Sequence, residues 1–238
     1  MKVISLIIPV YNEERFVGDL LQKVSQLNFS NLWYKHELVI VNDGSKDNSE
    51  HIIKNFLEWY NGMYTYLSQK NSWKGAAIKY GISHASWGVY VIQDADLEYN
   101  PHDITILLQT LEDKNLDICY GSRTLWYFTY GAKYSTFFFF VWWLVVSFLT
   151  SILALKIVTD EPTCYKMYRK KCKDILLMPS ENDFAWEPAV TMLLLKKWFS
   201  YAEKPIHYYP RKQQQGKKIK LIDGWKAIKT LFIYRFAR

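Results

Sequence analysis

The sequence has few of the residues that mark secreted, disulfide-linked or zinc-stabilised proteins. It contains three cysteines in 238 residues, Cys119, Cys164 and Cys172, and their spacing matches no metal-binding motif. An odd number of widely spaced cysteines argues against a disulfide framework and a zinc site, so a reducing compartment is expected. The N-terminus lacks the charged leader, apolar segment and cleavage site that a signal peptide combines in that order. We therefore expect no export by this end.

Internal repeats and low-complexity blocks are also missing, and acidic residues are scarce near the C-terminus. Half of the residues are hydrophobic and 17% are aromatic, which excludes global disorder. The length allows one large α/β domain. The net charge of +7 is concentrated in a basic tail, which suits anionic lipid headgroups or nucleic acid. In the last stretch of the chain only Asp223 opposes Lys204, Arg211, Lys212, Lys217, Lys218, Lys220, Lys226, Lys229, Arg235 and Arg238.

Short apolar runs alternate with longer amphipathic ones up to about residue 122. This βαβ pattern predicts a mostly parallel sheet covered by helices. Ligands of such sheets lie outside the carboxyl ends of the strands, so the polar residues there are the functional candidates. The expected strands are Ile4 to Val10, Glu37 to Val41, Met63 to Leu67, Gly88 to Gln93 and Asp117 to Gly121, and the expected helices are Glu13 to Leu27, Asn48 to Trp59, Gly75 to Ala85 and His102 to Asp113.

An uncharged, strongly apolar run from Phe137 to Leu155 is just long enough to span a bilayer of roughly 30 Å. A single crossing would separate the N-terminal sheet from downstream segments that look like parts of the same domain. We therefore favour interfacial or re-entrant helices, with Trp142 and Trp143 at headgroup level. A transmembrane helix and a buried core helix are the alternatives. Downstream we expect a strand at Thr163 to Tyr168, a helix at Pro188 to Lys197 and a strand at Tyr201 to Tyr209.

The expected fourth strand runs directly into three carboxylates at alternate positions, Asp94, Asp96 and Glu98. Alternate side chains point the same way in extended chain. Clustered like charges repel unless a cation compensates them, and oxygen ligands suit Mg²⁺ or Mn²⁺ rather than zinc. Such a metal can bridge a diphosphate and stabilise its charge as it leaves. A solvated acidic loop is the alternative interpretation.

Two other strand ends carry groups that can bind a nucleoside. Tyr11 lies in Pro9-Val10-Tyr11-Asn12-Glu13, where its ring can stack on a flat ligand. Asp43 precedes a turn glycine, Gly44, where its carboxylate can accept hydrogen bonds from a base or a ribose. An ordinary Asp-Gly turn is the other interpretation of the second motif.

Taken together, these motifs resemble the family 2 glycosyltransferases of the GT-A fold, and in particular the dolichyl-phosphate mannose and glucose synthases. The resemblance implies a single Rossmann-like α/β domain with a mostly parallel central sheet and a membrane-associated helical segment. Its parts are a nucleotide-sugar-binding core at residues 1–133, membrane-associated helices at 134–158, the rest of the catalytic domain at 159–210, and a basic loop and tail at 211–238. The matching motifs are Pro9 to Glu13, Val41 to Ser45, Lys74 to Ala77, Asp94 to Glu98, Gly121 to Arg123, Thr159 to Lys166, Trp186 to Pro188, Tyr209 to Arg211 and Gly216 to Ile219.

The resemblance implies a role for each matching residue. Asp94, Asp96 and Arg123 are the catalytic candidates. Asp94 contacts the ribose or sugar side of the donor, and Asp96 with Glu98 binds the metal. Arg123 faces the acceptor phosphate. Some relatives place a second arginine at this phosphate, and here Lys133 is the only nearby cation that could take that role. The donor nucleotide is assigned to Pro9, Tyr11, Glu13, Asp43, Lys74 and Asp94, with Arg211 and Lys217 closing over its diphosphate.

The implied reaction is the inverting transfer of mannose or glucose from GDP-mannose or UDP-glucose to a polyprenyl or dolichyl phosphate at the cytoplasmic face of a membrane. A lipid phosphate is already an anion, so positioning, metal neutralisation and exclusion of water suffice without a strong base. The alternative acceptor is a saccharide hydroxyl, as in surface-polysaccharide assembly. Such an acceptor needs a general base, and Asp160 or Glu187 is then the candidate. With a lipid phosphate as acceptor, both residues would instead hold the acceptor loop.

A catalytically silent membrane-bound adaptor is a further alternative, and the retained carboxylates count against it. A nucleic-acid partner is not expected, because the basic tail lacks a recognisable nucleic-acid-binding module.

Overall fold

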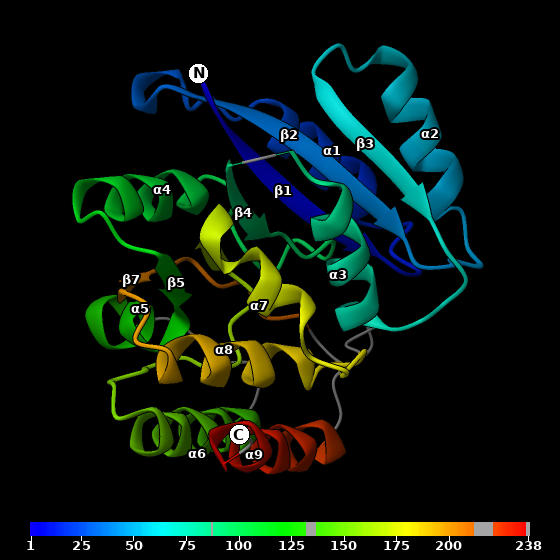
Figure 1. Cartoon of the computed structure of the whole chain (residues 1–238). Coiled ribbons are helices and arrows are strands. Elements are labelled where there is room, and N and C mark those ends of the chain that lie inside the picture. The colour runs from blue at the N-terminus through cyan, green and yellow to red at the C-terminus, as the bar shows by residue number, and fades with distance from the viewer. Residues whose placement is uncertain (87, 132–136, 212–220, 237–238) are drawn as a thin grey trace.

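The computed structural model describes residues 1–86, 88–131, 137–211 and 221–236 (Figure 1). Its centre is a seven-stranded sheet in the order β3-β2-β1-β4-β6-β5-β7. Six of the nine residues of β1 are buried, as expected for a central strand covered on both faces. The strands are β1 Lys2–Val10, β2 Tyr34–Asn42, β3 Met63–Ser68, β4 Gly88–Ile92, β5 Ile118–Ser122, β6 Lys166–Arg169 and β7 Tyr201–Pro205.

Strand direction confirms a mostly parallel sheet with one exception. β6 pairs antiparallel with both β4 and β5, whereas the other neighbours are parallel. β6 also begins later than predicted, at Lys166, and Cys164 within the predicted range lines the pocket. The final predicted strand is too long, since it ends at Pro205. Beyond it the backbone N–H of His207 donates to Asp103 at 2.7 Å instead of continuing the sheet.

Helices flank the sheet, and three of them form a separate stack at one side (Figure 1). α8 contacts both α6 and α9, which lie side by side as the outer layer. The predicted helix at Glu13 to Leu27 begins later, at Val17, and α5, α7 and α9 were not predicted. The helices are α1 Val17–Ser25, α2 Ser49–Trp59, α3 Lys74–His84, α4 Asp103–Asp113, α5 Arg123–Tyr130, α6 Phe137–Ala154, α7 Lys173–Leu177, α8 Trp186–Lys196 and α9 Leu221–Phe236, with short 3₁₀ turns at Ser30–Leu32 and Lys170–Cys172.

The apolar run forms the single helix α6, which is buried on one side only. Trp143, Val146 and Ala154 are buried, whereas Phe148 and Ile152 are exposed. The prediction that Trp143 lies at headgroup level is therefore wrong, because its ring faces the protein interior. Among the residues described, we find no helix with both the length and the apolar character needed to cross a membrane.

A close backbone approach fixes the start of α3 against the loop before α8. A Cβ at Gly75 would lie 2.8 Å from the carbonyl oxygens of Asn182 and Asp183 and 2.7 Å from Cβ of Trp186. The Ala76 N–H donates to the Asn182 carbonyl at 3.0 Å in the same contact. Only glycine allows these two segments to meet at this distance.

We expect Gly75→Ala to destabilise the protein by about 1–3 kcal/mol, because two backbone segments must separate to admit the methyl group. Urea unfolding measures the difference. Gly18→Ala is the matched control, since Gly18 is likewise the second residue of its helix and its added Cβ meets only a methyl group of Ile52 at 3.2 Å. Equal stabilities of the two variants would contradict this account.

Candidate functional site

The carboxyl ends of β1, β2 and β4 open into a pocket of about 670 Å³ that α3, α6, α8 and α9 complete. Nearly all the predicted site residues lie together in its wall, although the sequence scatters them over two hundred positions. Asp160 stands behind the wall, and Lys133 and Lys217 lie outside the described residues. The predicted residues that line the pocket are Pro9, Tyr11, Glu13, Asp43, Lys74, Asp94, Asp96, Glu98, Arg123, Glu187 and Arg211.

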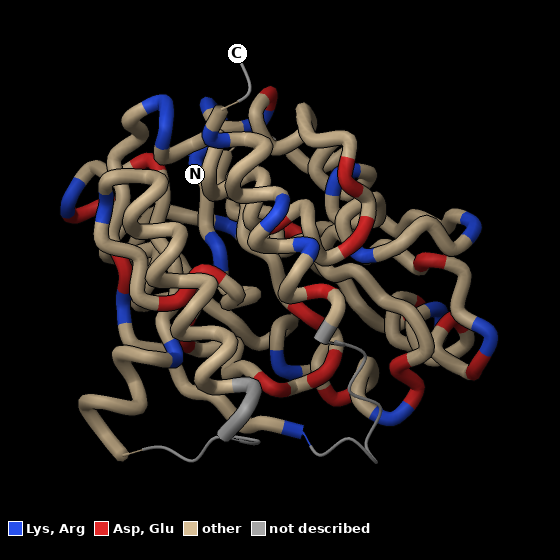
Figure 2. Tube along the Cα trace, turned by 90° about the horizontal axis from the view of Figure 1, so that it is seen from below, with Lys and Arg blue, Asp and Glu red and all other residues tan. Residues whose placement is uncertain are grey.

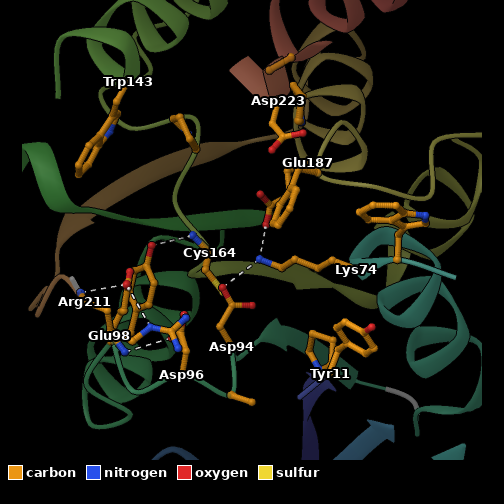
Figure 3. A pocket seen from close by; sticks show the side chains of 18 of the residues that line it. Tyr11, Lys74, Asp94, Asp96, Glu98, Trp143, Cys164, Glu187, Arg211 and Asp223 are labelled. Atoms are coloured by element: carbon orange, nitrogen blue, oxygen red, sulfur yellow. Dashed lines mark hydrogen bonds and ion pairs between the residues drawn. The ribbon is translucent and has the colours of Figure 1, made fainter. Parts of the chain in front are cut away.

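Arg211 lies in the middle of the acidic residues (Figure 3). Its guanidinium donates to Asp96 at 2.7 Å, to Glu13 at 3.1 Å and to Glu98 at 3.3 Å. Its backbone N–H also donates to Glu98 at 3.0 Å. One arginine thus links the carboxylates that follow β1 with those that follow β4. Without its positive charge, these carboxylates would repel each other.

Glu98 is held by donors on both oxygens. The Tyr208 hydroxyl donates to one oxygen at 3.0 Å, and Arg211 donates to the other. The Tyr209 N–H donates to the Glu98 carbonyl at 2.8 Å. Tyr208 was not predicted as a site residue, because nothing in its local sequence distinguishes it from the chain's other tyrosines.

Asp94 and Asp96 have opposite electrostatic environments. Burial, reinforced by repulsion from Asp94 and Glu98, raises the pKa of Asp96 to about 7. Burial also disfavours the charge of Asp94, but the ion pair with Lys74 outweighs it and lowers the pKa of that carboxyl. Adjacent acids with pKa values moved apart are typical of sites that handle charge.

Lys74, at the start of α3, joins two parts of the pocket. Its ammonium donates to Asp94 at 2.9 Å and lies 3.3 Å from Glu187 (Figure 3). Although burial opposes charging, attraction by these two carboxylates raises the pKa of Lys74 well above its usual value. Glu187, the candidate base for a hydroxyl acceptor, thus forms an ion pair with Lys74.

The end of β2 forms a polar corner of the pocket. Asp43 accepts from the Gln69 side chain at 2.7 Å and from the Ser72 N–H at 2.9 Å. Gly44 adopts a φ of +71°, and a Cβ there would lie 2.7 Å from the Asn71 nitrogen. Burial raises the pKa of Asp43 above its ordinary value despite these donors. The loop bearing Asn71 and Ser72 is thus attached directly to the predicted nucleoside residue.

Arg123 and Asp160 form a buried, two-pronged ion pair. Nε and a terminal nitrogen of Arg123 donate to the two Asp160 oxygens at 2.9 and 2.8 Å, and the Arg123 backbone N–H donates at 2.7 Å. The Trp143 ring covers the guanidinium at 3.6 Å. The side chain of Asp160 thus takes two of the five guanidinium N–H bonds, and its role here is to hold Arg123 rather than to face the pocket.

The pocket has an apolar half beside this polar one. α6 contributes Phe140, Trp142 and Val146 to its wall, and α9 contributes Gly224 and Ala227. Trp142 packs on Gly224 so closely that a Cβ there would lie 1.5 Å from the indole nitrogen. We did not expect α9 to reach the site, because from the sequence this part of the chain is recognised only as a basic tail.

The oxygen donors fit a hard divalent cation, although a guanidinium stands among them here. Among the described side chains, no group of three or more His, Cys, Asp or Glu is arranged to hold a metal as it stands. Mg²⁺ and Mn²⁺ need fewer, since one or two carboxylates plus substrate phosphates complete their coordination. Asp96 and Glu98 offer two carboxylates, and burial, together with repulsion from Asp94 and Glu98, raises the pKa of Asp96.

Glu161 is a buried acid in the same pocket wall. Its Oε1 has no hydrogen-bond partner among the described residues and lies 3.9 Å from the ammonium of Lys166. That ammonium donates to the carbonyls of Glu161 and Thr163 at 2.7 and 2.6 Å. Burial raises the pKa of Glu161 to about 7, although Lys166 opposes the shift.

Comparison with known families gives a match over most of the chain. The model of the family described as "Glycosyl transferase family 2" matches residues 5–176. The dolichyl-phosphate beta-glucosyltransferase ALG5D of Trichomonas vaginalis is 26% identical over 245 residues, covering 99% of this chain and 74% of that protein. ALG5A of the same organism is 25% identical over 231 residues, covering 92% and 68%.

Solved structures with the same architecture include glucosyl-3-phosphoglycerate synthase from Mycobacterium tuberculosis in complex with Mn²⁺, uridine diphosphate and phosphoglyceric acid. The TM-score is 0.70 with 15% identity, over 100% of this chain and 80% of that one. S. aureus TarS gives a TM-score of 0.59 with 17% identity, over 100% and 73%. At these identities the likeness shows the fold alone, which is a GT-A-like α/β fold with a mostly parallel mixed sheet.

Glu161→Gln should change how stability depends on pH. The pKa of Glu161 is raised from 4.5 to about 7, so between these values the unfolded chain loses a proton that the folded chain keeps. Wild-type stability therefore falls as pH rises through this window, by roughly 1.4 kcal/mol per unit, and the glutamine variant escapes this loss. Urea unfolding at pH 5 and pH 8 should show the variant gaining relative stability at the higher pH.

The exposed Glu58 provides the control for this experiment, since Glu58→Gln should leave the pH dependence unchanged. A constant difference between Glu161→Gln and wild type across the range would contradict the assignment.

Proposed function

Since the chain belongs to glycosyl transferase family 2, we propose that it transfers a hexose from a nucleoside-diphosphate sugar to a polyprenyl phosphate at a membrane surface, using Mg²⁺ or Mn²⁺. The observation that carries this proposal is the two-part pocket. Its carboxylates and cations suit a nucleotide sugar and a phosphate, while Phe140, Trp142 and Val146 suit the start of a prenyl chain. Glucose is favoured over mannose, because both Trichomonas relatives are named as glucosyltransferases.

The donor would lie along the carboxyl ends of β1, β2 and β4. Asp43 and the Tyr11 ring would hold the nucleoside, and Asp94 would face the ribose or the sugar. Asp96 and Glu98 would hold the divalent cation, which when bound neutralises charge on the leaving diphosphate. Arg211 would then exchange its carboxylate partners for donor phosphate oxygens, which guanidinium groups bind in the same forked manner.

The acceptor would approach from the side of Arg123. Asp160 engages two guanidinium N–H bonds and Trp143 covers one face, so the remaining N–H bonds can orient a phosphate oxygen. A phosphate anion attacks the anomeric carbon without a base, so transfer depends on alignment and exclusion of water. The ion pair between Lys74 and Glu187 supports this scheme over transfer to a saccharide hydroxyl, since the candidate base is occupied.

Lipid-phase transfer tests the proposal directly. Purified protein with Mn²⁺ or Mg²⁺ should move radiolabel from UDP-glucose, more than from GDP-mannose, into an organic-extractable polyprenyl phosphate. Asp96→Asn should lower this rate at least about 100-fold, because charge on the leaving diphosphate loses its counterion site. The exposed Asp113→Asn variant should match wild type. Donor consumption without lipid label would sink the acceptor assignment, and label from a metal-free reaction would sink the metal assignment.

Arg211→Gln should change the affinities for the metal and for the donor nucleotide in opposite directions. Arg211 occupies the carboxylates that the cation needs, so its removal should tighten Mn²⁺ binding to the donor-free protein at least about fivefold. The same change should weaken binding of UDP, because a phosphate ligand is lost. Mn²⁺ electron paramagnetic resonance and nucleotide titration measure the two effects. Arg15→Gln, at an exposed position, is the control, and weaker Mn²⁺ binding in Arg211→Gln would refute the competition.

A further inference from the structure

The outward sides of α6 and α9 are apolar, although both helices lie at the surface. On α6 the exposed residues recur every three or four positions, which defines one continuous stripe. α9 repeats the arrangement, with Trp225 and Phe236 exposed by 62% and 71%. We call these two stripes together the outer face; it consists of Val141, Val145, Phe148 and Ile152 of α6 and Ile222, Trp225, Phe232, Ile233 and Phe236 of α9.

The inner sides of the same helices are apolar as well. Val146 and Ala154 of α6 and Leu231 of α9 pack with Met192 and Leu195 of α8 in a small separate core. The two helices therefore have hydrophobic residues on opposite sides. A helix of this kind is stable only when both sides are covered, and an exposed apolar surface of this extent marks an interaction site.

The charges beside the outer face indicate what covers it. α6 carries no charged residue, and α9 carries Lys226, Lys229 and Arg235 against Asp223 alone. Lys226 and Lys229 are both exposed. Lys229 lies one helical turn from both Trp225 and Phe232, on the same side of α9, whereas Lys226 pairs with Asp183 at 2.7 Å. Figure 2 views the molecule from this side and marks its charged residues. Two copies meeting symmetrically through this surface would bring like charges together, whereas an anionic lipid surface complements them.

We propose that the outer face docks on a lipid bilayer with anionic headgroups. The α6 and α9 helices lie in the plane of the leaflet, and their aromatic and aliphatic side chains enter the acyl boundary while Lys229 meets the headgroups. Trp225 then lies at headgroup level, the position that we expected from the sequence for Trp142 and Trp143.

Docking in this orientation brings the membrane to the apolar half of the pocket. Phe140, Trp142 and Val146 of α6 and Ala227 of α9 line that half, so the helices that contact the bilayer also form the pocket wall. Gly224 lets Trp142 pack directly on α9, and the Trp142 and Trp225 rings lie 5.1 Å apart across this contact. This step rests on the proposed function, because it assumes an acceptor that resides in the leaflet.

Vesicle sedimentation tests the docking. The full chain should pellet with phosphatidylcholine vesicles that contain about 30 mol% phosphatidylglycerol, and less with phosphatidylcholine alone or at high salt. The triple variant Phe148→Ser, Trp225→Ser, Phe232→Ser should lose at least about tenfold in vesicle affinity, since three large apolar side chains no longer leave water. The double variant Trp33→Ser, Trp59→Ser changes comparably exposed tryptophans outside the outer face and should bind like wild type.

A second measurement does not depend on how the triple variant folds. Lipids with a quencher in the acyl chain should quench the protein's tryptophan fluorescence, and Trp225→Phe should remove more of this quenching than Trp59→Phe. Equal loss in the two single variants, or a wild-type protein that stays in the supernatant with anionic vesicles, would overturn the proposal. So would a lipid-free dimer in ultracentrifugation that the triple variant converts to monomer, because the outer face would then bind a second copy.

Failure of docking and failure of the proposed reaction have different signatures. With a short, water-soluble prenyl phosphate the triple variant should transfer sugar as wild type does, and with the acceptor in vesicles it should be impaired. Vesicle binding without transfer to either acceptor would leave the docking in place and remove the proposed reaction. Equal transfer by both proteins to the vesicle acceptor would remove the docking and leave the reaction.

Discussion

The repulsion among Glu13, Asp96 and Glu98 is the constraint on which the site depends. These carboxylates come from the ends of β1 and β4, and the sheet brings them together regardless of their charge. Arg211 compensates them from the far end of the chain, 113 to 198 positions away. The C-terminal part of the chain is thus required to stabilise a strand-end cluster that the first hundred residues create.

The N-terminal half of the fold could be predicted because its information is local. Apolar runs, turn residues and helical periodicity define β1 to β5 with errors of one to three residues at most ends. The antiparallel direction of β6 has no such local signal, since a strand's direction follows from the path of the chain outside it. α5 was missed because it is only eight residues long and consists largely of threonine and aromatic residues, which favour helix weakly.

The site residues likewise divide into those that local sequence predicts and those that it does not. Residues at strand ends could be identified, because all parallel strands deliver their carboxyl ends to one edge of the sheet. Their partners could not, since the pairs of Arg123 with Asp160, Lys74 with Glu187 and Glu98 with Tyr208 join segments 37 to 113 residues apart. These pairs also define the surroundings of each group, because Glu187 lies in an ion pair with Lys74 that its local sequence does not indicate.

α6 shows why composition alone did not identify the inner and outer sides of a helix. Its polar residues, Ser147, Thr150 and Ser151, lie on the buried or half-buried side, so no polar stripe in the sequence marks the solvent side. Burial in the fold separates the two sides: Trp143 turns inward onto Arg123, and Phe148 turns outward. Residues of one uncharged run thus contribute both to the wall of a charged pocket and to the outer face. Each of these two sides of the helix needs a different partner to cover it. The protein itself provides the first partner, and a lipid surface has the apolar character and the charge to be the second.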